Sequence, residues 1–193
     1  MTEAGATIAT MSSEPKRATY QDVLDAPEHT VAELIDGALY THARPRLRHA
    51  ISSSRLGAVL AADLDAKIGR VGGWIVLDEP ELHLGGDVLV PDLAAWRIER
   101  FPEDGDEVGI AVSPDWVCEV LSPSTTTHDR LRKLPKYATA GVAWVWLVDP
   151  IARTLEVYRR ADPLWHLVAI HDDAKDVTCE PFDGVLLPLR KLW

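Results

Sequence analysis

The segment from Asp115 to Thr125, DWVCEVLSPST, constrains the fold most, because a carboxylate stands inside an apolar strand pattern. Alternation along the strand gives two faces, with Trp116, Cys118 and Val120 on one and Val117, Glu119 and Leu121 on the other. Glu119 is therefore expected to lie among apolar neighbours. An ionised carboxylate in such a place needs a cation, a metal ion or several hydrogen-bond donors, and otherwise its pKa rises until it is neutral.

A second strand pattern, DVLVPDLAAW, also contains one acid among apolar residues. Asp92 shares its predicted strand face with Val88, Val90, Ala94 and Trp96. One divalent cation shared by both acids would explain both strands, because Mg²⁺ takes oxygen ligands from one or two carboxylates. Each acid also has a purely structural interpretation: Asp92 could cap a turn after Pro91, and Glu119 could pair with an arginine.

Length and composition narrow the class of protein. The 193 residues fit one domain with a core of its own, and the formal charge of -10 argues against a broad basic face, although a local basic cleft stays compatible with it. Cys118 and Cys179 match no zinc spacing, so we expect free thiols in a reducing cytoplasm. The sequence has no apolar run of about 20 residues and no signal-peptide pattern, which predicts a soluble, cytoplasmic protein without a membrane span.

The N-terminal region predicts a tail, a short helix and a hairpin. Residues 1–18 are expected to form a disordered tail, and residues 19–193 a single domain. Thr19 is expected to cap a helix that ends near Ala26. Asp36-Gly37 between two β-like runs predicts a hairpin, because a type I′ turn needs positive φ at both central residues. Glu33 lies in the first arm, where an exposed strand acid and a site residue are equally compatible.

The next region predicts a helix followed by strands. Apolar residues recur at helical spacing over residues 47–68, and His49 near the start could reach a site or remain at a helix end. WIVLDEP predicts a strand, and two more strands around Gly85-Gly86 deliver Asp92. Residues 97–113 are charged and predict a solvated loop.

After Glu119 the period changes from two to 3.6, which predicts a helix over residues 125–141. Asp129 would favour the positive end of this helix, and Pro135 should kink or shorten it. Lys133 follows Asp129 by four residues, so the two could form a surface ion pair. Lys133 could instead turn back over the carboxylates and supply the positive charge that they need.

The C-terminal third predicts further strands. VAWVWLVDP is typical of a central strand buried on both faces, and TLEVYRR and WHLVAIH alternate as outer antiparallel strands do. The apolar end, PFDGVLLPLRKLW, could pack back onto the body or onto a second subunit.

In this order the elements resemble the core of PD-(D/E)xK nucleases, and four segments resemble more narrowly the Uma-two family of restriction-type endonucleases. The segments are AELIDGALY, VPDLAAW, EVLSPSTTTHDRLRKLPKYATAGV and WLVDP, within about Thr19 to Tyr158. The resemblance implies an α/β (α+β) fold with a restriction-endonuclease-like core. Helices would flank a central mixed β-sheet, with an N-terminal β-hairpin and extra C-terminal strands.

The resemblance also implies roles for single residues. Asp92 matches the acid of the Pro-Asp motif and Glu119 the acid of the third motif, and both would hold Mg²⁺ or Mn²⁺ together with the Val120 carbonyl. Leu121 stands where the general pattern expects lysine, and Lys133 matches the lysine that replaces it in this family.

Four further positions complete the implied site. Glu33 matches the family's acid before Ile-Asp-Gly and could add a ligand through water, whereas Trp144 stands where an acid is usual. Lys136 is the fallback for Lys133 if Pro135 rotates the helix. Accessory roles are expected for His49, Lys136 and Asp129, and no residue is assigned to an organic cofactor.

The resemblance implies a metal-dependent endonuclease that hydrolyses DNA phosphodiester bonds, and a homodimer is expected because double-strand cutting is easiest with two related sites. The alternative is a catalytically weak nuclease-like domain that binds nucleic acid or protein. A third hypothesis is a hydrolase of small phosphate esters or a structural homodimer. Fold analogy alone does not choose among them.

Overall fold

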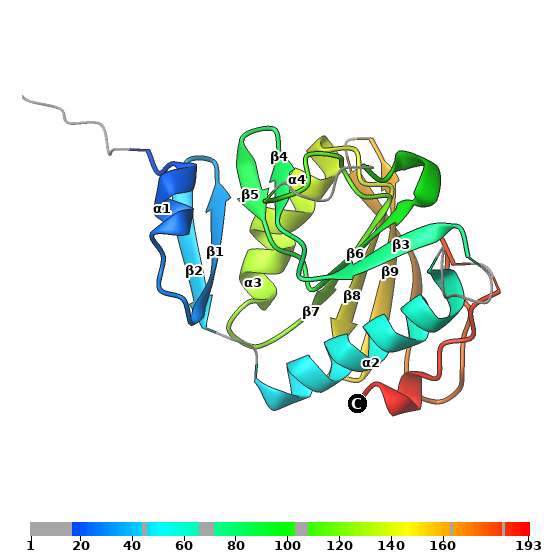
Figure 1. Ribbon diagram of the computed structural model, residues 1–193. Helices are drawn as coiled ribbons and strands as arrows, with labels where there is room; N and C mark the ends of the chain where they lie inside the picture. The colour runs from blue at the N-terminus through cyan, green and yellow to red at the C-terminus, as the bar shows by residue number, and fades with distance from the viewer. Residues whose placement is uncertain (1–16, 44–45, 66–71, 103–107, 163, 183) are drawn as a thin grey trace, which may run out of the picture.

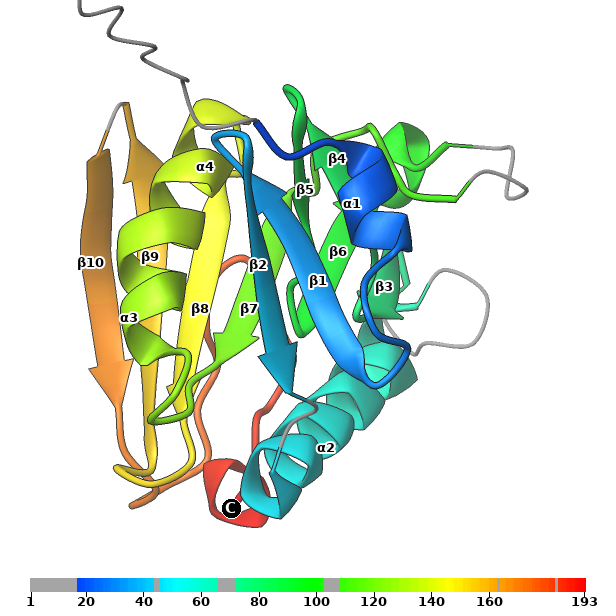
Figure 2. The same ribbon diagram turned by 90° about the vertical axis from the view of Figure 1, so that its left-hand side faces the viewer.

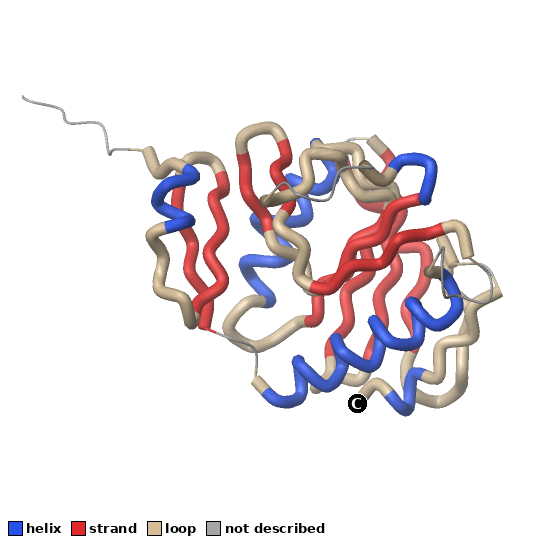
Figure 3. The backbone as a smooth tube through the Cα atoms, viewed as in Figure 1, coloured by secondary structure: helices blue, strands red, loops and turns tan. Residues whose placement is uncertain are grey.

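In the part of the chain that the structure describes, the strands form two sheets (Figures 1 and 3). The structure, a computed structural model, describes residues 17–43, 46–65, 72–102, 108–162, 164–182 and 184–193. The small sheet has the order β2 (Ala38–Ala43), β1 (Thr30–Ile35), β5 (Asp87–Leu89) and β4 (Leu82–Leu84). The large sheet has the order β10 (Leu164–His171), β9 (Thr154–Ala161), β8 (Trp144–Asp149), β7 (Trp116–Val120), β6 (Leu93–Arg97) and β3 (Trp74–Asp78).

The predicted hairpin forms one half of the small sheet. Asp36 and Gly37 both have positive φ, 54° and 75°, as a type I′ turn requires. This two-residue turn sets the register Ile35↔Ala38, so every second pair along β1 and β2 lies on the same face. On its other side β1 pairs with β5. The short helix that the sequence predicts forms as α1 (Tyr20–Leu24), and it packs on the hairpin sheet.

The large sheet is mixed, because β7 and β8 are parallel and the other pairs are antiparallel. The chain crosses from β7 to β8 through α3 (Thr126–His128), the π-helical turn η2 (Asp129–Lys133) and α4 (Leu134–Thr139). The residues of β7 are all buried, and those of β8 are buried except at its two ends. This confirms a central strand at VAWVWLVDP with outer antiparallel strands after it.

Different elements cover the two faces of the large sheet. On one face α2 (Leu47–Leu64) packs Leu56, Leu60 and Leu64 onto the β7 face that carries Trp116 and Cys118. On the other face α4 and the small sheet pack onto Val117, Val145 and Leu147. Figure 2 shows the hairpin and the α3–α4 segment side by side over this second face. Alternation in β7 therefore sorts its residues as the sequence predicts, and Glu119 belongs to the second face.

The helix predicted over residues 125–141 is interrupted where proline requires it. Pro135 has no N–H, and its ring would clash with the carbonyl of Leu131 in a regular α-helix. The chain adopts a π-helical turn over Asp129–Lys133 just before Pro135. Such turns shift the side chains that follow them relative to a continuous α-helix, and they are frequent at functional sites.

Two other predictions need correction. We expected Asp92 within a strand, but β5 ends at Leu89 and β6 begins at Leu93, so Asp92 lies in the connection between the two sheets. Residues 98–100 form a 3₁₀ turn, η1 (Ile98–Arg100), inside the predicted solvated loop. The predicted tail up to residue 16 lies outside the described residues. The helix predicted over residues 47–68 ends earlier, at Leu64, with Asp65 as its C-cap.

The C-terminal segment packs back onto the body. Leu187, Leu189 and Leu192 are buried in the core beneath α2, and η3 (Leu189–Lys191) forms the last turn. The Ser52 hydroxyl on α2 donates a hydrogen bond to the Leu192 carbonyl at 2.9 Å. Of the two outcomes left open by the sequence, the chain adopts the first, so this segment offers no argument for a dimer. Cys118 and Cys179 are free thiols, and no described helix is long and apolar enough to cross a membrane.

Candidate functional site

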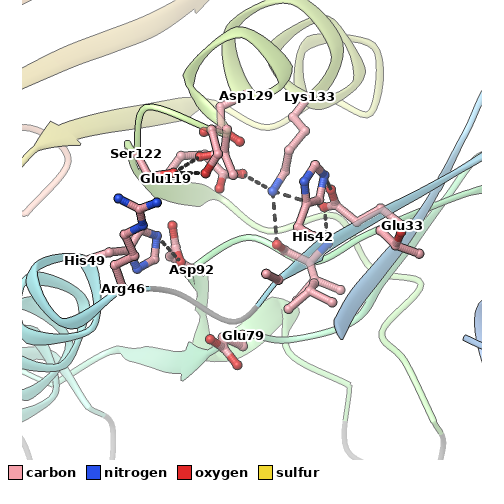
Figure 4. A pocket seen from close by; sticks show the side chains of 16 residues that line it. Glu33, His42, Arg46, His49, Glu79, Asp92, Glu119, Ser122, Asp129 and Lys133 are labelled. Carbon is pink, nitrogen blue, oxygen red and sulfur yellow. Dashed lines mark hydrogen bonds and ion pairs between the residues drawn. The ribbon is translucent and has the colours of Figure 1, made fainter. Parts of the chain in front are cut away.

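Asp92 and Glu119 lie on the same side of the large sheet. Leu93 pairs with Cys118 in the antiparallel register of β6 and β7, which places Asp92 opposite Glu119. The Val120 N–H donates to Asp92 Oδ2 at 2.7 Å, which fixes this carboxylate at the end of β7. Both acids line one cavity of about 390 Å³ (Figure 4). The strand arrangement therefore brings together the two acids that the sequence singled out.

Lys133 enters the same cavity from η2 and is 4% exposed. Its ammonium Nζ lies 2.8 Å from Glu119 Oε1 and 3.0 Å from Glu33 Oε1, and it donates to the Val90 carbonyl at 3.0 Å. These three partners come from β7, β1 and the connection between the sheets (Figure 4). Lys133 is thus a buried cation between two acids rather than one half of a surface pair with Asp129.

Glu33 is fully inside the site, being 1% exposed. Its Oε1 accepts the Val90 N–H at 2.9 Å and faces Lys133, and its Oε2 lies 2.9 Å from His128 Nε2. Burial by itself would raise the pKa of Glu33, but the charge of Lys133 and the bonds from His128 and Val90 outweigh it and lower the pKa to about 2. Glu33 is therefore a carboxylate at neutral pH, and the exposed-acid interpretation is wrong.

At Glu119 the effect of burial on the pKa is larger than the effect of the positive charge of Lys133. Burial, together with the neighbouring carboxylates Asp129 and Asp92, raises its pKa well above the usual value, and Lys133 opposes this rise. The Tyr137 hydroxyl donates to Glu119 Oε1 at 2.5 Å. Burial also raises the pKa of Asp129, which is 4% exposed and lines the cavity. Ionisation of Glu119 and Asp129 is therefore less favourable in the site than in water, and a bound cation would favour it.

Helix α2 contributes a histidine to the site. His49 Nε2 lies 3.1 Å from Asp92 Oδ1, so Asp92 is held on one oxygen by His49 and on the other by the Val120 amide. Burial lowers the pKa of His49, but the bond to Asp92 outweighs it, so the pKa is raised. His49 therefore lies at the site, as one of its two interpretations predicted.

The fallback residue Lys136 lies elsewhere. Its ammonium group pairs with Asp87 at 2.9 Å and with Asp36, both at the turn end of the small sheet. Lys133 is the lysine among the described residues that line the cavity. The structure thus corrects the expectation that Lys136 could replace it. The Val120 side chain packs in the core on the far face, so any role as a ligand rests on its carbonyl and stays a prediction.

Comparison with protein families matches residues 18–190 to the Uma2 family, whose description is "Putative restriction endonuclease". The chain belongs to the Uma2 family. Among solved structures it is similar to a "putative nuclease belonging to DUF820 from Anabaena variabilis ATCC 29413", with a TM-score of 0.70 and 23% sequence identity, over 90% of this chain and 96% of that chain. At this identity the similarity concerns the fold. No curated protein matches the chain.

The family and the fold of this protein are therefore those of restriction-type nucleases. The acid pair and Lys133 lie in one cavity although Leu121 occupies the usual lysine position. Leu121 instead packs in the core with Leu134 and Tyr137, next to the π-turn that carries Lys133. Lys133, which lies in the helical segment after β7, thus reaches the acids from the face of the sheet that carries Glu119.

The donor set suits a hard divalent cation. The cavity is lined by five acidic side chains, Glu33, Glu79, Asp92, Glu119 and Asp129, against the cations of Lys133 and Arg46. A carboxylate offers about four lone-pair directions, and each oxygen of Asp92 has one partner among the described residues, so acceptor capacity remains. Oxygen ligands in excess of positive charge are what Mg²⁺ and Mn²⁺ require.

Among the site residues that escaped the sequence analysis are His42, His128 and Tyr137. His42 could have been found from the hairpin, because the two-residue turn pairs Glu33 with Tyr40 and Val31 with His42 on one face. Nothing in the sequence placed His128 beside the hairpin, because that contact joins α3 to β1 across 95 residues. The helical spacing of apolar residues indicates a buried ring at Tyr137, but it gives no sign that the Tyr137 hydroxyl contacts Glu119.

Proposed function

We propose that this protein is a metal-dependent endonuclease that hydrolyses DNA phosphodiester bonds. The observation that carries the proposal is the convergence of Asp92, Glu119 and Lys133, from three different elements, on one cavity. The family assignment supports the same activity. We further propose that residues 19–193 act as a single domain and that the protein is cytoplasmic.

Asp92, Glu119 and the Val120 carbonyl would hold Mg²⁺ or Mn²⁺. When bound, such an ion lowers the pKa of a water ligand and stabilises negative charge on the scissile phosphate. Neighbouring groups orient the two acids for metal binding: His49 and the Val120 amide hold Asp92, and Tyr137 holds Glu119. Held donors and acceptors need little rearrangement when substrate binds.

Lys133 would supply positive charge to the phosphate as negative charge develops there. Burial would lower its pKa, but the charges of Glu119 and Glu33 outweigh this and raise it, so Lys133 stays protonated at neutral pH. It therefore acts by charge and position rather than as a proton acceptor. Glu33 and the Val90 carbonyl orient its ammonium group, and Glu33 could also add a ligand through water.

A second candidate is a nuclease-like domain that binds nucleic acid or protein with little turnover. The observation that favours it is that the Lys133 ammonium already has three partners within 3.0 Å, which restrains it from turning to a phosphate. The net charge of -10 points the same way, because it weakens attraction to DNA outside a local cleft. We propose a homodimer for the active form, since cutting both strands requires two sites in related orientations.

The test is cleavage of supercoiled plasmid by the full chain with Mg²⁺, with Mn²⁺ and with EDTA. Asp92→Ala and Lys133→Ala should abolish nicking and linearisation. Lys136→Ala is the control and should cut as the unaltered protein does, because Lys136 pairs with Asp36 and Asp87 away from the cavity. Circular dichroism checks that each variant is folded. Metal-dependent cutting that survives in folded Asp92→Ala contradicts the proposed site. Absence of cutting with retained DNA affinity supports the binding module instead, and absence of both supports a hydrolase of small phosphate esters or a structural role.

A further inference from the structure

The carboxylate of Glu33 serves two different sets of partners, one on each oxygen. Oε1 faces Lys133 and the Val90 N–H. Oε2 faces two histidines, with His128 Nε2 at 2.9 Å and His42 Nε2 at 3.7 Å. The proposed nuclease site uses the first side only. The second side is a separate group of potential ligands that the proposed mechanism leaves unused.

The three side chains on this second side are gathered tightly enough for one ion. One ligand atom from each of Glu33, His42 and His128 lies within 4.8 Å of the other two. Bonds of about 2.0–2.1 Å from Zn²⁺ to nitrogen and oxygen place tetrahedral ligand atoms roughly 3.4 Å apart, so small side-chain shifts suffice. His42 Nε2 is buried and has no hydrogen-bond partner among the described residues, although a buried ring nitrogen normally has one.

We propose that Glu33, His42 and His128 form a second metal site, which takes a borderline divalent ion of the Zn²⁺ class. Two imidazoles and one carboxylate match the preferences of Zn²⁺, whereas Mg²⁺ prefers oxygen ligands alone. Three protein ligands leave a fourth position open, and Glu33 and His42 both line the cavity, so that position faces the space where substrate would enter. The proposal does not depend on nuclease activity.

The elements that carry these ligands are held firmly. Glu33 and His42 lie on paired strands, two residues apart in the register and on one face of the hairpin. His128 is the last residue of α3, and its ring packs against the rings of His42 and Tyr40 with centroids 4.6 Å and 4.8 Å apart. Ligands on paired strands and a packed helix end lose little freedom when an ion binds, which favours binding.

The test compares melting of the metal-stripped full chain with ZnCl₂ and with MnCl₂, because an ion that binds the folded state raises its melting temperature. His42→Ala and His128→Ala should weaken Zn²⁺ binding at least about tenfold and keep the Mn²⁺ shift. Asp92→Asn should do the reverse. His166→Ala, an exposed histidine on β10, should keep both shifts. A Zn²⁺ shift that persists in both histidine variants, or one that Asp92→Asn removes together with the Mn²⁺ shift, overturns the proposal.

Cobalt substitution of the unaltered protein keeps the test decisive if a histidine variant fails to fold. One equivalent of Co²⁺ in the Glu33-His42-His128 site should give the intense visible bands of a four-coordinate ion with nitrogen ligands. Only the weak bands of an octahedral oxygen site would show that the ion prefers the carboxylates of Asp92 and Glu119, and this would overturn the proposal.

Discussion

Replacing Lys133 by methionine removes a buried positive charge and leaves most of the side-chain volume. In the native protein this ammonium group lies 2.8 Å from Glu119 and 3.0 Å from Glu33, and both acids are at most 2% exposed. Removing one member of a buried ion pair costs about 3–5 kcal/mol, because the remaining charge is left uncompensated. The Lys133→Met variant should therefore lose about 4 kcal/mol of unfolding free energy, which for a chain of this size is roughly 10 °C in melting temperature.

The assay is urea unfolding of the full chain in EDTA, which keeps divalent ions from replacing the missing charge. Lys136→Met is the matched control, since Lys136 has the same side chain in the same helical segment but pairs with the largely exposed Asp36 and with Asp87. This control should change stability by no more than about 1 kcal/mol. In buffer without EDTA, added Mn²⁺ should stabilise Lys133→Met more than it stabilises the unaltered protein, because the ion then replaces the missing positive charge beside the same acids.

A double variant separates the charge argument from lost packing. Glu33→Gln should destabilise the unaltered protein, because it removes a partner of Lys133. In the Lys133→Met background the same change should be neutral or stabilising, because it removes an uncompensated carboxylate. If Lys133→Met is no less stable than Lys136→Met, or if the two changes at 33 and 133 are simply additive, the account of this site as a network of compensating charges is refuted.

Two further outcomes follow from contacts around the site. Tyr137→Phe should cost about 1–3 kcal/mol in urea unfolding, because Glu119 loses a buried donor; an unchanged midpoint would show that the 2.5 Å bond contributes nothing. Arg130 binds both oxygens of Glu156; burial would raise the pKa of Glu156, but Arg130 outweighs it and lowers the pKa from its usual 4.5. This stabilisation is present above pH 4.5 and is lost as pH falls through the lowered pKa. Because solvent screens the pair, Glu156→Gln should be about 1 kcal/mol less stable than the unaltered protein at pH 7, and this difference should shrink as the pH falls below 4.5. A difference that stays constant with pH would contradict this.

The parts of the fold that depend on local periodicity could be predicted from the sequence. Alternation gave the faces of β7, the Asp36-Gly37 pair gave the hairpin, and the apolar run gave β8 as a buried strand. The acid pair followed from the same reasoning, because a carboxylate on an apolar face needs a partner. The choice of Lys133 over Lys136 depended on the resemblance to a family, since periodicity alone favours neither.

The parts that depend on long-range packing could not be predicted. Nothing local shows that β5 and β6, three residues apart, belong to different sheets, because that division results from the pairing of β1 with β5. Burial of Glu33 follows from the same pairing. The π-turn at Asp129–Lys133 was foreseen only as a disturbance at Pro135. His128 joined the site through a contact that no sequence pattern signals.

The three-residue passage from Val90 to Asp92 joins the two sheets, and bonds to site side chains hold both its ends. The Val90 amide and carbonyl are bound by Glu33 and Lys133, and the Asp92 carboxylate is bound at the end of β7. Any change in the angle between the two sheets would therefore move the same atoms that set the distance between the two acids.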